Sequence, residues 1–246
     1  MSDLIEELKA LVDEHGVLTG AAVRERMIHV WYARPIEAQC IVRPTTTAQV
    51  AAVLRLCHER GQSVIPHGGL TGLVQGCNVS DTDVVLSLER MNQVEDIDTV
   101  GRTMTVQAGV PLQVLQETAA EHGLMFPLDL GARGSCQIGG NVSTNAGGNR
   151  VIRYGMTRDN VLGLEAVLAD GTVVTSLNTM IKNNAGYDLK HLFIGTEGTL
   201  GIVTRVVIRL REAPRNLSTA FAGFDNFPQV TRFLRFIDRE LGGALC

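Results

Sequence analysis

The residues of this chain that could bind a ligand gather in three glycine-rich segments. Residues 64–73 read Val-Ile-Pro-His-Gly-Gly-Leu-Thr-Gly-Leu, so an apolar run ends in a proline turn that is followed by paired glycines. Glycine lets the backbone approach a ligand closely, and successive amide groups can then hold a phosphate. The segment lacks the glycine spacing of a dinucleotide-binding Rossmann loop and the lysine of a Walker A loop. Taken alone, it fits a glycine turn without any ligand nearly as well.

The other two segments add polar side chains and a strand. Residues 139–148 read Gly-Gly-Asn-Val-Ser-Thr-Asn-Ala-Gly-Gly, a mixture of backbone amides and small polar side chains that suits a pyrophosphate and a ribityl chain. Residues 195–203 read Gly-Thr-Glu-Gly-Thr-Leu-Gly-Ile-Val, a glycine turn that leads into an apolar run. Each segment alone is weak evidence. Three of them in this order, with strands between them, strongly indicate a cofactor site.

Regular elements must hold these segments in place, and apolar spacing predicts most of them. The pattern predicts helices over residues 3–14, between Thr45 and Gly61, from Pro111 onward and over 227–241, and strands over 63–65, 84–88, 103–106, 162–168, 172–175, 202–210 and 219–224. Residues 162–168 and 172–175 form a hairpin. Residues 131–155 show little regular pattern, which fits either a functional loop or a flexible linker.

Composition limits the classes of protein and partner. With 45% hydrophobic and 20% charged residues, the chain is an ordinary globular sequence. Its net charge of −4, without a basic block, argues against nucleic acid and anionic membranes as partners. No apolar run approaches the roughly 18 residues of a membrane span, and the acidic N-terminus lacks the features of a signal or transit peptide. We therefore expect a cytoplasmic protein.

The cysteines and histidines predict neither disulfides nor a metal site. The five cysteines are Cys40, Cys57, Cys77, Cys136 and Cys246. Their odd number and the absence of C-x-x-C spacing favour buried, reduced thiols. The six histidines include no pair at metal-ligand spacing.

Longer motifs around the three segments resemble a known flavoprotein family. Residues 126–141 read Phe-Pro-Leu-Asp-Leu-Gly-Ala-Arg-Gly-Ser-Cys-Gln-Ile-Gly-Gly-Asn, and Thr-Asn-Ala-Gly-Gly at 144–148 and Arg-Tyr-Gly at 153–155 follow. Residues 162–172 and 184–201 continue the match. Roughly residues 30–245 are similar to the FAD-binding domain, of the p-cresol methylhydroxylase or vanillyl-alcohol oxidase type, of D-2-hydroxyglutarate dehydrogenases, D-lactate dehydrogenases and glycolate oxidase flavin subunits.

The resemblance implies an α+β fold in which two subdomains share FAD. It predicts an N-terminal helical segment over residues 1–34 and an FAD-binding domain over 35–214, divided near residue 98. Residues 215–246 would be the truncated start of a C-terminal substrate domain. The part before residue 98 is expected to hold a small parallel sheet, and the part after it a larger sheet rich in antiparallel pairs.

The same match implies which residues bind the cofactor. The pyrophosphate would lie on Gly68 to Gly72, and the adenine, ribose and ribityl groups along the other segments. The implied set is Pro66, His67, Gly68, Gly69, Leu70, Thr71, Gly72, Leu73, Pro127, Gly131, Ser135, Ile138, Gly139, Gly140, Thr144, Asn145, Gly148, Tyr154, Gly155, Glu197, Gly201 and Ile202. Covalently flavinylated members of the superfamily can carry a histidine directly after the first glycine pair. Leu70 occupies that position here, so the match implies non-covalent FAD, and His67 is expected to pack the loop.

For function, the resemblance implies FAD-dependent oxidation of a small D-2-hydroxy acid (2-hydroxyglutarate, lactate or glycolate) to the 2-oxo acid, with an unidentified electron acceptor. The family's catalytic and metal-binding residues would lie beyond Cys246, so none is assigned here, and the chain alone is expected to be inactive. A homodimer is an open possibility for a full-length form. The alternative is a non-catalytic flavin-binding subunit that needs a separate substrate-domain partner. The match over residues 126–201 disfavours a cell-wall enolpyruvyl reductase, which shares this type of flavin domain.

Overall fold

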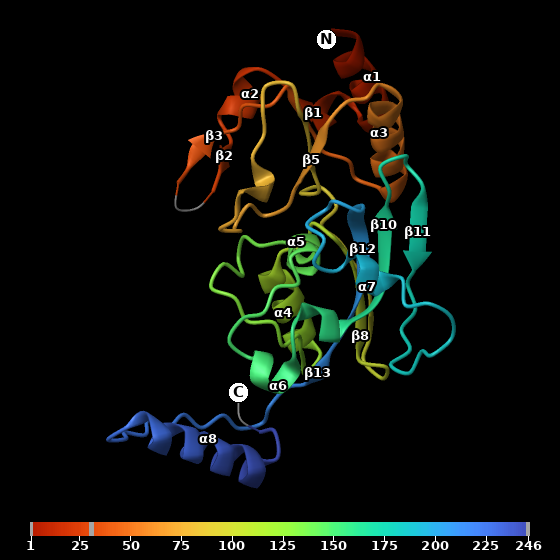
Figure 1. Ribbon diagram of the computed structural model, residues 1–246. Helices are drawn as coiled ribbons and strands as arrows, with labels where there is room; N and C mark the ends of the chain where they lie inside the picture. Colours follow the sequence, from red (N-terminus) through yellow and green to blue (C-terminus); the bar gives the residue numbers. More distant parts are fainter. Residues whose placement is uncertain (1, 30–31, 245–246) are drawn as a thin grey trace.

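The computed structural model describes residues 2–29 and 32–244, which build two main sheets with helices around them (Figure 1). Its helices are α1 (Ser2–Val12), α2 (Ala21–Arg24), α3 (Thr47–Glu59), α4 (Leu112–Glu121), α5 (Ile138–Ser143), α6 (Val151–Tyr154), α7 (Lys190–Phe193) and α8 (Phe227–Leu241). Its strands are β1 (Val17–Leu18), β2 (Met27–Ile28), β3 (Arg34–Pro35), β4 (Cys40–Val42), β5 (Val64–His67), β6 (Val84–Ser87), β7 (Val94–Asp98), β8 (Thr103–Gln107), β9 (Leu124–Met125), β10 (Val161–Val167), β11 (Val173–Ser176), β12 (Ile202–Arg209) and β13 (Arg211–Glu212).

The first sheet has the strand order β1-β4-β6-β5. β6 pairs in parallel with β4 and β5, and the short β1 adds antiparallel to β4. Every residue of β4 and β6 is buried, as expected for parallel strands that are covered on both faces. Because side chains alternate along a strand, Cys40 and Val42 enter the main core while Ile41 enters a smaller apolar cluster with Val23 and Ile36.

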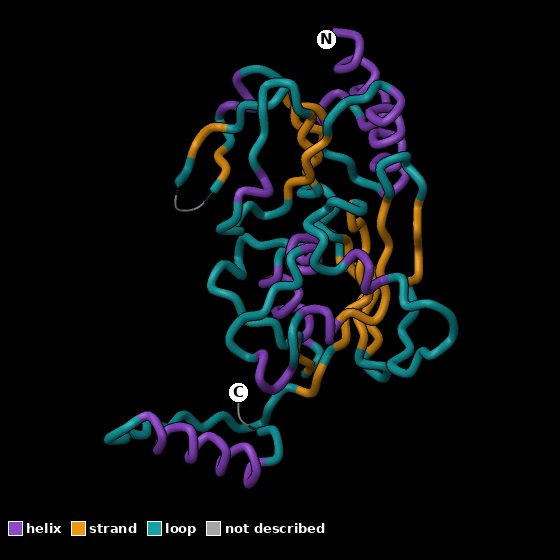
Figure 2. Tube along the Cα trace, in the orientation of Figure 1, coloured by secondary structure: helices purple, strands orange, loops and turns teal. Residues whose placement is uncertain are grey.

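The second sheet has the order β11-β10-β12-β8-β7, and all of its pairs are antiparallel. The predicted hairpin is β10 and β11, and the predicted strand at 202–210 is the central strand β12. β7 already belongs to this sheet, so the chain changes sheet between Ser87 and Val94. The expected small parallel sheet followed by a larger antiparallel one is confirmed. Loops and turns occupy much of the space around the junction of the two sheets (Figure 2).

One segment contains structure that its sequence pattern did not show, and one predicted strand was wrong. Residues 131–155 contain α5 and α6, which are only six and four residues long and therefore too short to show a helical period. Residues 219–224 form no strand, because they lie in a segment outside both sheets where no neighbouring strand pairs with their backbone groups. The predicted helix at 227–241 is confirmed as α8. It stands apart from the sheets (Figure 1), and none of its described side chains is buried.

The cysteines that the structure describes are reduced. Cys40, Cys57 and Cys136 are buried, as predicted, and Cys77 is half-buried. Burial raises the pKa of the Cys40 thiol to about 12 and that of Cys57 to about 11, so both are uncharged near pH 7. Cys246 lies outside the described residues. None of the helices in the described part combines the length and hydrophobicity of a membrane span.

Candidate cofactor site

His67 ends β5 and anchors the first glycine-rich loop. Its side chain is buried, and its Nε2 lies 2.9 Å from the carbonyl oxygen of Cys77. A carbonyl can only accept, so Nε2 carries the proton and donates it. Burial lowers the pKa of His67, which keeps the ring neutral near pH 7. The side chain therefore packs the loop, as expected from the sequence.

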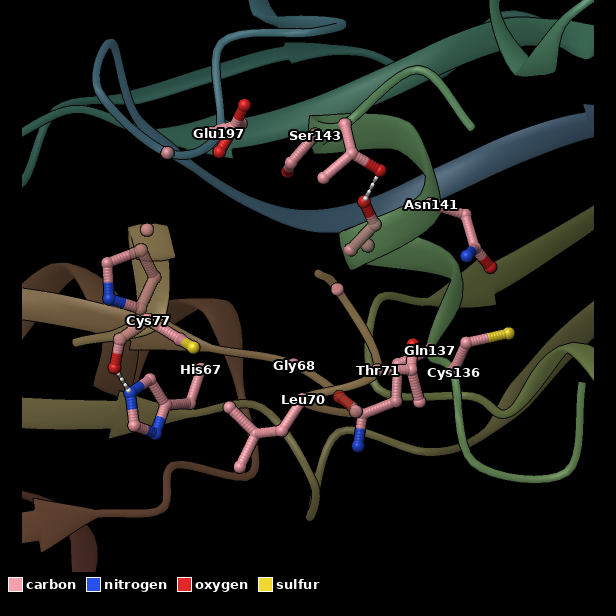
Figure 3. A pocket seen from close by; sticks show the side chains of 18 of the residues that line it. His67, Gly68, Leu70, Thr71, Cys77, Cys136, Gln137, Asn141, Ser143 and Glu197 are labelled. Carbon is pink, nitrogen blue, oxygen red and sulfur yellow. Dashed lines mark hydrogen bonds between the residues drawn. The ribbon is translucent and has the colours of Figure 1, made fainter. Parts of the chain in front are cut away.

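The loop from Gly68 to Leu73 lies against the second glycine-rich segment (Figure 3). A Cβ on Gly69 would lie 2.0 Å from the carbonyl oxygen of Ser135, so only glycine fits between these two backbones. A Cβ on Gly68 would lie 3.7 Å from the Cα of Gly140. Directly after Gly69, Leu70 adopts a φ of 55°, which non-glycine residues rarely do. The backbone at Ser135, just before the second segment, thus limits the shape of the first loop.

The second segment forms α5 and the turn after it, and its two leading glycines have different surroundings. The Gly139 amide donates to the Ala108 carbonyl at 2.8 Å, and a Cβ on Gly139 would lie 2.6 Å from the Ala108 Cβ. By contrast, apart from its chain neighbours and the backbone of α5, no described atom lies within 4 Å of a Cβ built on Gly140. Gly139 therefore allows close packing, while Gly140 leaves open space.

The third segment contacts the other two. The Glu197 amide donates to the Ser143 carbonyl at 2.8 Å, which joins the segment to α5. Gly198 has a φ of 84°, and a Cβ there would lie 2.6 Å from Cγ of Pro66. Glu197 has a φ of 53°. Three segments that are far apart in the sequence therefore meet around one space.

These segments wall a cavity of about 350 Å³, which we call the main cavity. The predicted residues that line it are Pro66, His67, Gly68, Gly69, Leu70, Thr71, Gly72, Leu73, Gly139, Gly140, Thr144, Glu197 and Ile202. The other predicted residues do not line the main cavity: Pro127, Gly131, Ser135, Ile138, Asn145, Gly148, Tyr154, Gly155 and Gly201. Among these, Asn145 accepts a hydrogen bond from the Arg158 amide at 3.0 Å. Gly201 lines a second cavity of about 290 Å³ that shares Pro66, Gly198 and Ile202 with the first.

Two buried amide oxygens in the lining suit a ligand with hydroxyl groups. The side chain of Asn141 is 5% exposed, and its Oδ1 has no hydrogen-bond partner among the described residues. The buried Oε1 of Gln137 is likewise unpaired within the described chain. An unpaired buried acceptor costs roughly 1–3 kcal/mol, so hydroxyl donors of an occupant would relieve that cost. The residues present therefore fit an occupant that carries hydroxyl groups, as the expected FAD does.

The predicted set of individual residues did not include part of the lining, although some of the residues left out lie within the second and third segments. The missed residues are Val74, Gly76, Cys77, Leu88, Ala108, Leu130, Cys136, Gln137, Asn141, Ser143, Ala146, Gly198 and Val203. Gln137, Asn141 and Ser143 lie in or beside the second segment, and their polar side chains were an available signal. Leu88 and Ala108 each follow a strand and carry no chemical signature, so only the fold reveals that they line the cavity.

Comparison with known proteins assigns the family. The family model described as an FAD binding domain matches residues 38–176, which is more than half of the chain. The chain belongs to the FAD binding domain family. The solved structure of alkyldihydroxyacetonephosphate synthase matches this FAD binding domain with a TM-score of 0.76 over 88% of this chain and 41% of that chain. The sequence identity there is 24%, so this likeness shows the fold alone.

Several sequence relatives of this FAD binding domain are named as dehydrogenases. The mitochondrial D-2-hydroxyglutarate dehydrogenase of Bos taurus is 49% identical over 208 residues, covering 85% of this chain and 38% of that protein. The D-2-hydroxyglutarate dehydrogenase of Xanthomonas citri pv. viticola is 45% identical over 203 residues, covering 81% and 42%. The chain thus spans about two-fifths of the length of these relatives.

Proposed function

We propose that this chain is the FAD-binding part of a dehydrogenase that oxidises a D-2-hydroxy acid to the 2-oxo acid. The observation that carries the proposal is the main cavity, where three glycine-rich segments, two of them within the matched FAD binding domain, meet beside two unpaired buried amide oxygens. The substrate class comes from the relatives, because D-2-hydroxyglutarate dehydrogenases are 45% and 49% identical over most of this chain.

Each wall of the main cavity has its own task in this proposal. The backbone of Gly68 to Gly72 binds the pyrophosphate, and the amide oxygens of Gln137 and Asn141 accept hydrogen bonds from hydroxyl groups. When bound, FAD supplies the hydride acceptor, while the protein orients it and excludes competing reactions. Leu70 presents only a hydrocarbon side chain, so we propose that FAD binds without a covalent bond at this position.

A second candidate is a flavin-binding subunit without its own substrate site. No arginine or lysine is among the described residues that line the main cavity. A substrate carboxylate would therefore find no ion-pair partner in this lining, and its anchor would belong to another segment or another chain. Under either candidate, the electron acceptor and the cytoplasmic location remain predictions.

Visible absorption of the purified chain tests both the cofactor and the activity. We expect a flavin spectrum, release of the flavin into the supernatant on acid precipitation, and rebinding of FAD after its removal. Anaerobic D-2-hydroxyglutarate should leave the spectrum of this chain unchanged and bleach that of a longer form. A chain that neither retains nor rebinds FAD would refute the proposal. Bleaching of the 246-residue chain alone would show that the substrate site lies within it.

A further inference from the structure

A cluster of three charged side chains lies at the carboxyl ends of the parallel strands. Arg43 directly follows β4, and Glu89 follows β6 after Leu88. Arg26 comes from the bend between α2 and β2. Nη1 and Nη2 of Arg26 lie 2.5 and 2.9 Å from the two carboxylate oxygens of Glu89, and Nη1 of Arg43 lies 3.2 Å from its Oε1. We call this group the Arg26–Glu89–Arg43 cluster.

The cluster adjoins the loop that forms one wall of the main cavity. Arg26 and Glu89 line a small cavity of about 190 Å³ together with His67, Gly68 and Leu70. The same three loop residues line the main cavity. Ligands of parallel sheets generally bind outside the carboxyl ends of the strands, which is where this loop begins. One short stretch of backbone therefore borders both the charged cluster and the main cavity.

The cluster carries an uncompensated positive charge. Burial by itself would raise the pKa of Glu89, but the guanidinium groups of Arg26 and Arg43 more than offset this and hold that pKa below its ordinary value. Glu89 is therefore ionised near pH 7, and two arginines with one carboxylate leave a net charge of +1. The described lining of the main cavity contains no arginine or lysine, and Glu197 adds a negative charge there. A diphosphate in this cavity would gain from a cation behind the loop.

We propose that the net charge of the Arg26–Glu89–Arg43 cluster sets the affinity of the main cavity for the diphosphate of its cofactor, acting across the Gly68–Leu70 backbone. This inference rests on the proposed function, since it takes FAD as the occupant. The competing interpretation is structural: the ion pairs merely tie the α2–β2 segment to the first sheet. The two interpretations predict opposite effects of removing the Glu89 charge on FAD affinity. An electrostatic field would strengthen binding as the net charge rises, whereas a structural role would weaken binding because the ion pairs are lost.

A charge series separates them. Arg26→Gln leaves Glu89 paired with Arg43 and lowers the cluster charge to 0, Glu89→Gln raises it to +2, and the double variant restores +1. We expect FAD to bind about tenfold more weakly to Arg26→Gln, about tenfold more tightly to Glu89→Gln, and with nearly the original affinity to the double variant. Fluorescence titration of the flavin-free protein gives these dissociation constants. Riboflavin, which has no phosphate, should bind all four proteins equally.

Salt provides a second readout. Raising the ionic strength should shrink the differences between the variants, because it screens a field but does not restore lost contacts. Weaker FAD binding by both single variants, or unchanged binding by both, would overturn the inference while leaving FAD as the cofactor. Equal losses for FAD and riboflavin would also overturn it and support the structural interpretation. If the unaltered chain binds no FAD, the proposed function fails first.

Discussion

Gly140 and Gly69 lie on neighbouring walls of the main cavity but meet different surroundings. A valine at Gly140 would project into space that no described atom occupies, so Gly140→Val should leave the flavin-free protein stable and lower FAD occupancy at least tenfold. A valine at Gly69 would collide with the Ser135 backbone, so Gly69→Val should also lower the free energy of unfolding, by about 1–3 kcal/mol. Flavin content per protein and thermal unfolding measure the two effects.

Gly223→Val is the matched control for these variants. A Cβ on Gly223 also meets open space, but Gly223 lies in the exposed segment before α8. Gly223→Val should change neither the flavin content nor the thermal unfolding of the protein. Full flavin content in Gly140→Val would show that the cofactor does not lie against this wall.

The buried His67 ring predicts a pH dependence of stability. Its pKa is lowered in the folded state by burial, while the unfolded chain takes up the proton near the ordinary value of 6.5. The unfolded state therefore binds more protons as the pH falls below about 6.5, and the free energy of unfolding decreases there by up to about 1.4 kcal/mol per pH unit. Urea unfolding between pH 7.5 and 5.5 measures this change. Most carboxylates titrate below this pH range and therefore contribute little to it.

The control for this prediction is His67→Gln, which keeps an N–H donor for the Cys77 carbonyl. The variant should lose stability less steeply than the original chain over the same pH range. Identical slopes for the two proteins would show that His67 does not cause the dependence.

At the scale of elements, Glu165 joins α3 to the second sheet. This residue of β10 is 8% exposed, and its Oε1 accepts hydrogen bonds from the hydroxyls of Thr47 at 2.6 Å and Thr204 at 3.0 Å. Glu165→Leu would leave both hydroxyls without this acceptor, so we expect a loss of about 1–3 kcal/mol in the free energy of unfolding. Glu165→Gln keeps an acceptor oxygen and should lose clearly less. Equal losses in chemical denaturation would contradict the assigned hydrogen bonds.

The sequence predicted well those helices and strands that are long enough to show a regular spacing of apolar residues. α3, β12 and α8 are long enough for their apolar spacing to be visible, and each forms where it was expected. The short helices α5 and α6 have too few residues for such a pattern, and α5 also contains two glycines. The apolar run at 219–224 has a strand-like composition, but pairing depends on a neighbouring strand, which local sequence does not specify.

The candidate site could likewise be predicted only in part from the sequence. Its glycines and the polar side chains among them are visible in the sequence, and all of residues 66–73 line the main cavity. The contribution of Leu88 and Ala108 depends on how two sheets approach each other. The packing roles of Gly148 and Gly155, which have φ values of 99° and 76°, likewise appear only in the folded chain.

At the scale of the whole molecule, α8 presents an uncovered apolar face. Phe227, Leu234 and Leu241 recur every seven residues and therefore lie on one side of the helix, and they are 75%, 48% and 52% exposed. Exposed apolar patches promote association, so we expect the chain to self-associate as its concentration rises. Replacing Leu234 and Leu241 together with glutamine should reduce this association in sedimentation experiments. The unfolding temperature should not change, because no described side chain of α8 is buried.

Arg235→Gln, on the same helix, controls for a general effect of altering α8. It should leave the association unchanged. Association that persists in the double glutamine variant would indicate that another surface is responsible.

The contact between Gly198 and Pro66 also constrains when the chain can acquire its cofactor during folding. The two residues wall one cavity, yet more than 130 positions separate them, and β12, which follows Gly198, is the central strand of the second sheet. Bringing two such distant residues together is slow, because the chain between them loses conformational entropy before the contacts at its ends can stabilise it. A nascent chain that has not yet delivered β12 therefore has no complete cavity, and flavin cannot guide the early steps. Cofactor capture becomes a late event that reports completed folding.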